Sequence, residues 1–329
     1  MISSQPLVSI VIPAYNYQRF LREAIDSVLN QTYSAVELIV LNDGSTDDTE
    51  SVLRSYPAGQ FYWETQSNRG QSATLNRGWA MSRGEILSYL SADDILKPES
   101  VSRAVQQLLH QPATAAVYSD FVLISEASRV LRRIKAPNFS YYDLLVKMIC
   151  QPGPGAFFRR TAFEQAGGWD VSLRQIPDLD FWLRIGLAGE IQRIPEVLAG
   201  FRVHDDSQTY APPPPERCDE PIRVVDRYFE RPDLPQEFRR LQPAADSNAR
   251  LTSAAMHWRG GRYRCSLSRV VEAGRLAPGN LLRPHAGHLM LHSLFSRARH
   301  RILAWRHRKP QVNATEETAS PEGSATTHG

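Results

Sequence analysis

Apolar runs and polar breaks alternate along the first two thirds of this chain. Residues 7–12, 36–41 and 86–90 leave almost no polar face, which predicts strands buried on both sides of a sheet. Residues 19–31 repeat apolar positions with the period of an amphipathic helix, and residues 68–82 are expected to form a loop that runs into a second helix. Strands and helices in this alternation predict an α/β fold with a doubly wound, Rossmann-like, mostly parallel sheet.

Shorter elements are expected around this frame. Strands are predicted at residues 61–63, 115–119, 191–194 and 197–203, and residues 156–159 are expected to run extended. Helices are predicted after Pro98 and at residues 141–149, 161–166 and 178–187. Residues 125–138 form a basic segment, for which a solvated loop face is the simpler interpretation.

Consecutive prolines at residues 212–215 mark a boundary, because a proline run forms a stiff, extended linker. We expect an α/β domain over residues 1–210, a linker over 211–219, a helical region over 220–309 and a disordered tail over 310–329. Glycine and proline pairs predict breaks in the helical region at Gly260–Gly261 and Pro278–Gly279.

The composition fits a globular protein with a sizeable core. The 329 residues are 42% hydrophobic and 22% charged, and the net charge of +3 is too small to indicate a nucleic-acid partner. Three widely spaced cysteines give neither a zinc motif nor a disulfide framework, which favours reduced thiols in the cytoplasm. No apolar run has the length of a membrane span, and the first residues do not resemble a secretory signal.

The C-terminal end of the helical region combines hydrophobic and basic residues. Residues 288–308 alternate leucines and aromatic side chains with arginines, and no acidic residue interrupts them. One interpretation is peripheral contact with an anionic membrane surface, which would place the protein at the inner face of the cell membrane. The other is a docked helix with a basic outer face.

Polar residues follow three of the predicted strands. Tyr15 and Asn16 follow the first, Asp43 the second and Asp93 the strand at residues 86–90. Right-handed crossovers place the carboxyl ends of parallel strands on one edge, so these residues are expected to converge. A nucleotide is a natural ligand there, because Asp43 can accept from a base N–H or a ribose hydroxyl; the alternative for Asp43 is a turn residue.

Asp93 and Asp94 form a pair of adjacent carboxylates. Two such groups repel each other unless a cation or a network of donors compensates their charge. The alternative interpretation is that one of them caps the helix that begins near Pro98.

Seven sequence blocks occur in an order that resembles glycosyltransferase family 2, the inverting nucleotide-sugar transferases of GT-A fold. They lie at residues 8–16, 38–47, 68–78, 90–94, 167–170, 178–184 and 201–204. The resemblance covers about residues 6–210, and the ordered series makes a chance match improbable.

The resemblance implies a role for each matching residue. Nucleotide-sugar binding is implied for Pro13, Ala14, Tyr15, Asn16, Asp43, Asn68, Gly70, Ser91, Ala92 and Asp93. Asp93 matches the last acidic position of the metal-binding DxD motif, and His204 matches a histidine that approaches the metal or the diphosphate. Asp178 matches the general base, and Gly168 and Trp169 match the floor of the acceptor site.

Some positions have an alternative explanation or depart from the family. Asp180 is expected to hold either the acceptor or Arg184, and His204 can also be a hydrogen-bonded residue at a strand end. Ser91 and Pro177 replace acidic residues that are usual in the family.

The implied function is metal-dependent, inverting sugar transfer. The donor is expected to be a nucleoside-diphosphate sugar, with UDP as the nucleotide that the resemblance favours. The expected cofactor is Mn²⁺ or Mg²⁺, and the expected acceptor is a glycan or lipid-linked glycan of the cell envelope. The departures at Ser91 and Pro177 keep open a degenerate module that binds nucleotide sugars without catalysis. A nucleotidyltransferase would need a Gly-rich basic loop after the first strand, which the segment starting at Pro13 does not provide.

Overall fold

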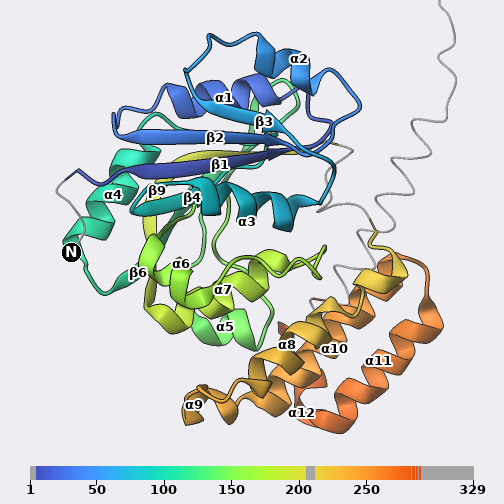
Figure 1. The fold of residues 1–329 in the computed structure, drawn as a ribbon. Coiled ribbons are helices and arrows are strands. Elements are labelled where there is room, and N and C mark those ends of the chain that lie inside the picture. The colour runs from blue at the N-terminus through green and yellow to red at the C-terminus, as the bar shows by residue number, and fades with distance from the viewer. Residues whose placement is uncertain (1–4, 205–211, 283, 286, 288, 290–329) are drawn as a thin grey trace, which may run out of the picture.

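A curved sheet with helices on both faces forms the larger part of the molecule, and a group of helices lies beside it (Figure 1). The computed structural model describes residues 5–204, 212–282, 284, 285, 287 and 289. The strands are β1 (Val8–Ala14), β2 (Val36–Asn42), β3 (Tyr62–Thr65), β4 (Ile86–Tyr89), β5 (Ile95–Leu96), β6 (Thr114–Ile124), β7 (Val130–Ile134), β8 (Phe157–Arg159) and β9 (Glu190–Arg202).

The helices of the sheet region connect these strands. They are α1 (Leu21–Leu29), α2 (Thr49–Arg54), α3 (Gln71–Met81), α4 (Ser100–His110), α5 (Tyr141–Leu145), α6 (Arg160–Ala166) and α7 (Pro177–Ala188). The expected helix at 141–149 ends early, since Met148 has a positive φ of 56° that a continuing helix cannot accommodate.

The described strands form one sheet in the order β3-β2-β1-β4-β8-β6-β9-β5, with β7 paired to β6. The first four strands of this order are parallel, as the crossover helices predict. β8 then runs antiparallel to both β4 and β6, and β9 runs parallel to β6. The sheet is therefore mixed, with its parallel half carrying the three strand ends selected from the sequence.

The basic segment contains a strand rather than only a loop. β6 extends five residues beyond the expected end at Ser119, and β7 pairs antiparallel with this extension. Most of β7 is exposed and arginine-rich, so it lacks the buried apolar alternation by which a strand is recognised in a sequence.

β9 is one long strand where the sequence predicts two short ones. Pro195 accounts for the apparent break, because it has no N–H to donate to a neighbouring strand. The register against β6 shifts at this point: Ile194 pairs with Ser119, and the next partners are Val197 and Asp120. A bulge accommodates the proline, and the strand continues to Arg202 at the edge of the cleft.

Two hydrophobic clusters cover the faces of the sheet, as the alternation of side chains along β1 requires. Ile10 and Ile12 belong to the cluster with α1 and α4, whereas Val11 belongs to the cluster with α3 and α7. Trp79 is fully buried in the second cluster, where it stacks on Phe181 with ring centroids 5.8 Å apart and donates to a backbone carbonyl of β4. Replacing such a tryptophan with alanine typically costs about 3–5 kcal/mol.

The C-terminal helices pack against the sheet region. They are α8 (Glu220–Glu230), α9 (Gln236–Arg239), α10 (Gln242–Arg259), α11 (Tyr263–Leu276) and α12 (Pro278–Leu281). Val224, Tyr228 and Phe229 of α8 belong to the same hydrophobic cluster as α7. The helix break predicted at Gly260–Gly261 is confirmed, and the second break falls at Ala277, because Pro278 and Gly279 begin α12. The division into domains stays a prediction.

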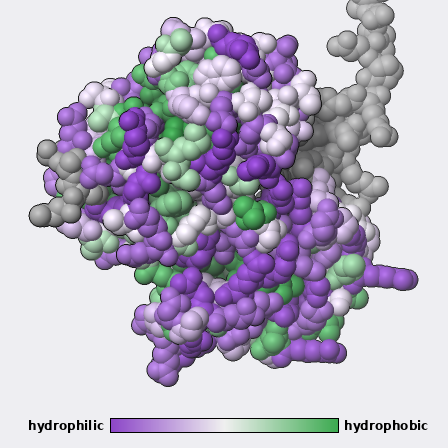
Figure 2. Space-filling view, viewed as in Figure 1, coloured by the Kyte–Doolittle hydropathy of each residue, from purple (hydrophilic) through white to green (hydrophobic). Residues whose placement is uncertain are grey.

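The visible surface is largely polar. In Figure 2, hydrophilic residues spread over both the sheet region and the C-terminal helices, and hydrophobic residues form small separate patches. None of the helices that the structure describes is long and apolar enough to cross a membrane. Apart from residue 289, the basic stretch at 288–308 and the predicted tail at 310–329 lie outside the described residues.

Candidate active site

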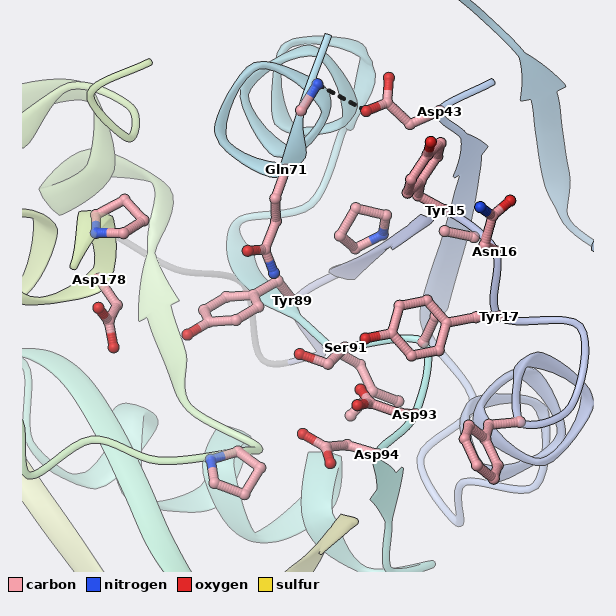
Figure 3. A pocket seen from close by; sticks show the side chains of 18 of the residues that line it. Tyr15, Asn16, Tyr17, Asp43, Gln71, Tyr89, Ser91, Asp93, Asp94 and Asp178 are labelled. Atoms are coloured by element: carbon pink, nitrogen blue, oxygen red, sulfur yellow. Dashed lines mark hydrogen bonds between the residues drawn. The ribbon is translucent and has the colours of Figure 1, made fainter. Parts of the chain in front are cut away.

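The carboxyl ends of β1, β2 and β4 open into a cleft of about 830 Å³ (Figure 3). Most of the residues selected from the sequence line it. They are Pro13, Ala14, Tyr15, Asn16, Asp43, Asn68, Gly70, Ser91, Ala92, Asp93, Trp169, Asp178 and His204. The structure thus brings together side chains from segments nearly 200 residues apart, while their roles stay predictions.

Asp43 is almost fully buried at the end of β2, where it holds the loop that follows β3. Its carboxylate accepts hydrogen bonds from the Gln66 side chain at 2.7 Å and from the backbone amides of Arg69 and Gly70 at 2.8 and 2.7 Å. A carboxylate has about four acceptor positions, so one remains for a donor on a bound ligand. Asp43 therefore shapes the pocket and retains the capacity to accept from a base N–H.

Asn16 ties the loop after β1 to the loop after β2. It has a positive φ of 59°, its amide donates to the Ser45 hydroxyl, and its side-chain oxygen accepts from the Thr46 amide at 2.8 Å. Its neighbour Tyr15 is 45% exposed on the cleft wall, so an aromatic ring is available for a planar ligand.

Asp93 and His204 meet in the same cleft. Asp93 Oδ2 and His204 Nε2 lie 2.9 Å apart, and the histidine ring packs against Phe20 with centroids 5.1 Å apart. This oxygen and nitrogen pair is a donor set that divalent cations accept. Among the residues that the structure describes, no group of three or more His, Cys, Asp and Glu side chains could hold a metal by itself.

Asp94 points away from this pair and binds β9. Its Oδ1 accepts from the backbone amide of Arg202 at 2.9 Å. Burial and the neighbouring charge of Asp93 raise the pKa of Asp94 well above its ordinary value, and Arg202 partly opposes this shift. The helix-cap alternative does not describe either carboxylate, because α4 begins at Ser100 with Glu99 at its N-cap.

Asp178 lies in the first turn of α7, on the far wall of the cleft from Asp93 (Figure 3). Burial raises the pKa of its carboxyl, and hydrogen bonds from the Leu179 amide, its own amide and the Cys150 thiol oppose the shift. The hydroxyl of Tyr89 extends from β4 toward Asp178. Asp178 therefore combines access to the cleft with an increased affinity for a proton.

Trp169 forms the floor between these walls. Its backbone amide donates to the side-chain oxygen of Asn76, whose nitrogen donates back to the Trp169 carbonyl, both at 2.8 Å. The indole packs edge-on against Tyr89 with centroids 5.1 Å apart. Gly168 does not line the cleft; a Cβ there would lie 2.3 Å from the Asn76 oxygen, so glycine permits this clamp.

Asp180 also lies outside the residues that line the cleft, and its expected contact with an acceptor stays a prediction. Its carboxylate pairs with Arg184 at 2.6 Å, the other interaction considered from the sequence. Arg184 further donates to the carbonyls of Ala166, Gly167 and Gly168. Asp180 thus supports the segment before Trp169 rather than facing the cleft.

Sequence reasoning missed several residues of the cleft. Additional lining residues include Tyr17, Gln71, Tyr89, Arg174, Gln175 and Arg217. Two further residues contact lining residues without lining the cleft themselves: Arg202 donates to Asp94 through its backbone amide, and the Cys150 thiol donates to Asp178. A charged residue inside an otherwise apolar strand was the available signal for Arg202, since a buried charge needs partners.

Comparison with known proteins identifies the family to which this chain belongs. Residues 9–167 match the family model described as glycosyl transferase family 2. Through these residues, the chain belongs to glycosyltransferase family 2. An uncharacterized glycosyltransferase of Rickettsia typhi is 35% identical over 62% of this chain and 66% of its own length. Chondroitin synthase of Escherichia coli is 28% identical over 61% of this chain and 30% of its own length.

This chain shares the GT-A fold of solved glycosyltransferase structures, as predicted. TarS residues 1–349 of S. aureus, in complex with UDP-GlcNAc, gives a TM-score of 0.62 at 13% identity, and the match covers 94% of this chain and 95% of that 1–349 fragment. The mannosyltransferase PcManGT of Pyrobaculum calidifontis, in complex with GDP-Man and Mn²⁺, gives a TM-score of 0.58 at 18% identity. This match covers 92% of this chain and 88% of the PcManGT chain. The chain spans two thirds or less of the length of the sequence relatives above.

Proposed function

We propose that this glycosyltransferase moves a sugar from a UDP-sugar to a hydroxyl of a glycan or lipid-linked acceptor, with inversion, during synthesis of a cell-envelope polysaccharide or glycoconjugate. The observation that carries the proposal is the shared cleft, in which Asp43, Asp93 and Asp178 come from three separate segments. The relatives support the substrate class, since TarS binds UDP-GlcNAc and another relative is a chondroitin synthase.

The reaction is a single displacement at the anomeric carbon. Asp178 takes the proton of the acceptor hydroxyl as its oxygen forms a bond to this carbon. The bond from the anomeric carbon to the diphosphate oxygen breaks, and its electron pair leaves with the nucleoside diphosphate. Attack from the face opposite the leaving group inverts the configuration, which fits the placement of Asp178 and Asp93 on opposite walls.

Asp93 and His204 would hold a divalent cation, Mn²⁺ or Mg²⁺. Their donor atoms converge at 2.9 Å beside the cleft, and such ions take few ligands from protein and the rest from phosphate and water. When bound, the cation supplies positive charge to the diphosphate leaving group. PcManGT, which is similar in fold, was solved with Mn²⁺, in support of this assignment.

The metal assignment is tested by removing Asp93. UDP should raise the melting temperature of the wild type much more with Mn²⁺ than without it, because nucleotide and metal bind together. Asp93→Ala should abolish this synergy and leave the smaller effect of UDP alone. Thermal shift with UDP, Mn²⁺ and both measures it; Asp48→Ala, at an exposed end of α2, is the control. Full synergy in Asp93→Ala would refute the assignment.

Peripheral membrane contact through the C-terminal region is a second part of the proposal. Besides the basic sequence at 288–308, one face of α11 exposes Tyr263, Leu267 and Val271 at 48%, 66% and 46%. Deleting residues 288–329 should weaken flotation with anionic liposomes by removing the basic side chains, while transfer to a soluble acceptor persists. A full-length protein that shows no salt-sensitive flotation would contradict this proposal.

A further inference from the structure

We propose that Arg174 and Arg217 form a subsite for a negatively charged oxygen group of the acceptor, a phosphate or a carboxylate. This inference rests on the proposed transfer reaction and specifies the class of acceptor. The subsite lies between the N-terminal ends of α3 and α7, next to the position of Asp178.

The subsite is a side pocket of the cleft with a volume of about 110 Å³. Its lining residues are Gln71, Ser72, Arg174, Pro177 and Arg217, and all of them except Ser72 also line the main cleft. The two hollows therefore lie side by side. At roughly 30 Å³ for each water molecule, the side pocket holds three to four waters, which suits a single charged group better than a sugar ring.

Arg217 supplies a positive charge that no acidic side chain among the described residues pairs with. It is half-buried, and no side-chain hydrogen bond or ion pair of its guanidinium exists among the described residues. A guanidinium in a polar pocket binds carboxylate and phosphate oxygens through two parallel N–H bonds. The hydroxyl of Ser72 and the side-chain amide of Gln71 add neutral donors to the same pocket.

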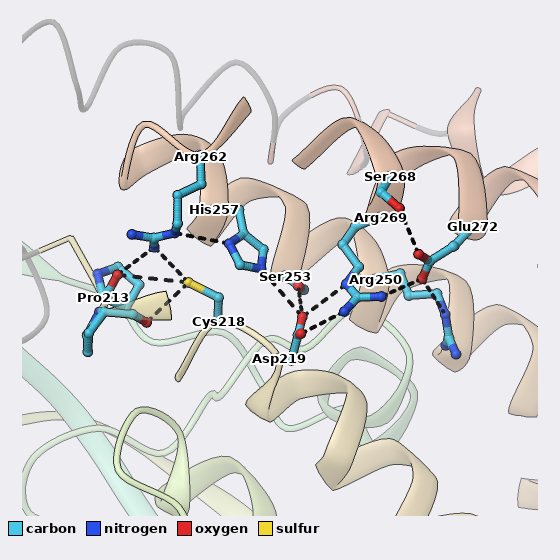
Figure 4. Close-up of polar contacts among 11 residues, drawn as sticks. Pro213, Cys218, Asp219, Arg250, Ser253, His257, Arg262, Ser268, Arg269 and Glu272 are labelled. Atoms are coloured by element: carbon cyan, nitrogen blue, oxygen red, sulfur yellow. Dashed lines mark hydrogen bonds and ion pairs between the residues drawn. The ribbon is translucent and has the colours of Figure 1, made fainter. Parts of the chain in front are cut away.

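Residues that precede and follow Arg217 in the sequence belong to a polar network with α10 and α11 (Figure 4). Arg262 donates to the Pro213 carbonyl at 2.7 Å and contacts the Cys218 sulfur at 3.0 Å. Asp219 pairs with Arg269 at 2.7 Å and accepts from a serine of α10 at 2.6 Å. The backbone on both sides of Arg217 is thus held to α10 and α11, which lowers the entropy cost of binding an anion.

Glu220 positions the backbone of Arg174, the second arginine of the side pocket. Its carboxylate, 1% exposed, accepts from the backbone amides of Arg174, Gln175 and Ile176 at 2.9, 2.7 and 3.1 Å. The Arg174 side chain lies against Gly70, where a Cβ would be 1.5 Å from its Nη1. Besides these three amides, the Glu220 carboxylate pairs with Arg223 at 3.7 Å, so its charge has partners outside the side pocket.

The position of the side pocket assigns it to the acceptor rather than to the nucleotide. Its lining includes Pro177, the residue before Asp178, but none of Tyr15, Asp93 and His204. An anion held there lies on the side of the cleft from which Asp178 would deprotonate the attacking hydroxyl. The two arginines would thereby favour acceptors with a charged group close to the hydroxyl that receives the sugar.

The test measures anion binding in the presence of saturating UDP and Mn²⁺, which occupy the nucleotide side. Inorganic phosphate and acetate are titrated at constant ionic strength, with chloride as the reference salt, and the melting temperature is recorded. Wild type should be stabilised by one of the two oxyanions, and the more effective one identifies the acceptor group as phosphate or carboxylate. Arg217→Ala should weaken its apparent affinity about 10–100-fold, the usual worth of hydrogen bonds to charged groups.

Matched variants separate the possible causes of a change. Arg217→Lys keeps the charge but loses the paired N–H geometry and should bind with intermediate affinity. Arg264→Ala removes an exposed arginine of α11 and should bind like the wild type. No stabilisation by either oxyanion, or equal stabilisation of wild type and Arg217→Ala, would overturn the subsite. Weaker UDP binding in Arg217→Ala would overturn its assignment to the acceptor, whereas a wild type that ignores UDP would refute the proposed function instead.

Discussion

Replacing Asp178 with asparagine should reduce sugar transfer by about 10²–10⁴-fold while donor affinity stays close to that of the wild type. A general base acts in the transition state, so its loss lowers turnover far more than ground-state binding. Asparagine keeps the size of the side chain and can accept from the amides of α7, but it cannot take the proton. Steady-state transfer and nucleotide titrations on the same preparation measure the two effects.

The pH dependence of sugar transfer tests the role of Asp178 independently. Burial raises the pKa of Asp178 above its ordinary value, and the base is active only when deprotonated. Wild-type turnover should therefore rise with pH through this raised pKa, on the acidic side of the profile. Asp178→Asn should lose this acidic limb along with most of its activity.

Asp180→Asn is the matched control, two positions further along α7. Because Asp180 pairs with Arg184 and does not line the cleft, this change should lower the melting temperature but alter turnover by less than about tenfold. Near-wild-type transfer by Asp178→Asn together with an inactive Asp180→Asn would show that the roles are reversed. A wild type that binds UDP but transfers no sugar to any acceptor would favour the non-catalytic binding module.

Arg202→Ala should cause the largest loss of stability among single changes near the cleft, about 3–5 kcal/mol. The side chain is 0% exposed, and its guanidinium donates to the carbonyls of Asp93 and Ser125 and to the carboxylate of Glu23 at 2.7, 2.9 and 2.6 Å. Its removal leaves a cavity and buried acceptors without donors. Chemical denaturation followed by tryptophan fluorescence measures the free energy of unfolding.

The loss of folding stability in Arg202→Ala should also increase as the pH rises. A carboxyl whose pKa is raised in the folded state stabilises that state at low pH, and this contribution disappears as the pH rises through the raised pKa. Asp94 is such a group, and Arg202 opposes its shift, so Arg202→Ala raises the pKa of Asp94 further. The difference from wild type should be smaller at pH 5 than at pH 8.

Two further variants test whether the loss of stability is specific to the guanidinium of Arg202. Arg202→Lys keeps the charge without the planar fork and should fall between alanine and wild type. Arg129→Ala, in the exposed turn before β7, should stay within about 0.5 kcal/mol of wild type, as surface changes usually do. Unfolding of Arg202→Ala at the wild-type denaturant midpoint would contradict the structural role assigned to Arg202.

The local pattern of apolar and polar residues was sufficient to predict the parallel half of the sheet. Continuous apolar runs identify buried strands, and the handedness of crossover connections then places the ends of β1, β2 and β4 on one edge. Asp43 and Asp93 could be selected on this basis, since each follows such a strand directly. The family blocks added Asp178 and His204, which no local periodicity connects to that edge.

What the sequence did not determine depends on contacts between distant segments. Pro195 divides the pattern of β9, and only pairing with β6 shows that a bulge absorbs it. The role of Arg202 depends on Glu23, 179 residues away, and that of Glu220 on amides 44–46 residues away. A short-range pattern records which residues prefer burial, but the partner of a buried charge is set by the packing of the whole chain. Tertiary structure alone therefore decided that Asp180 faces Arg184 and that Arg217 enters the cleft.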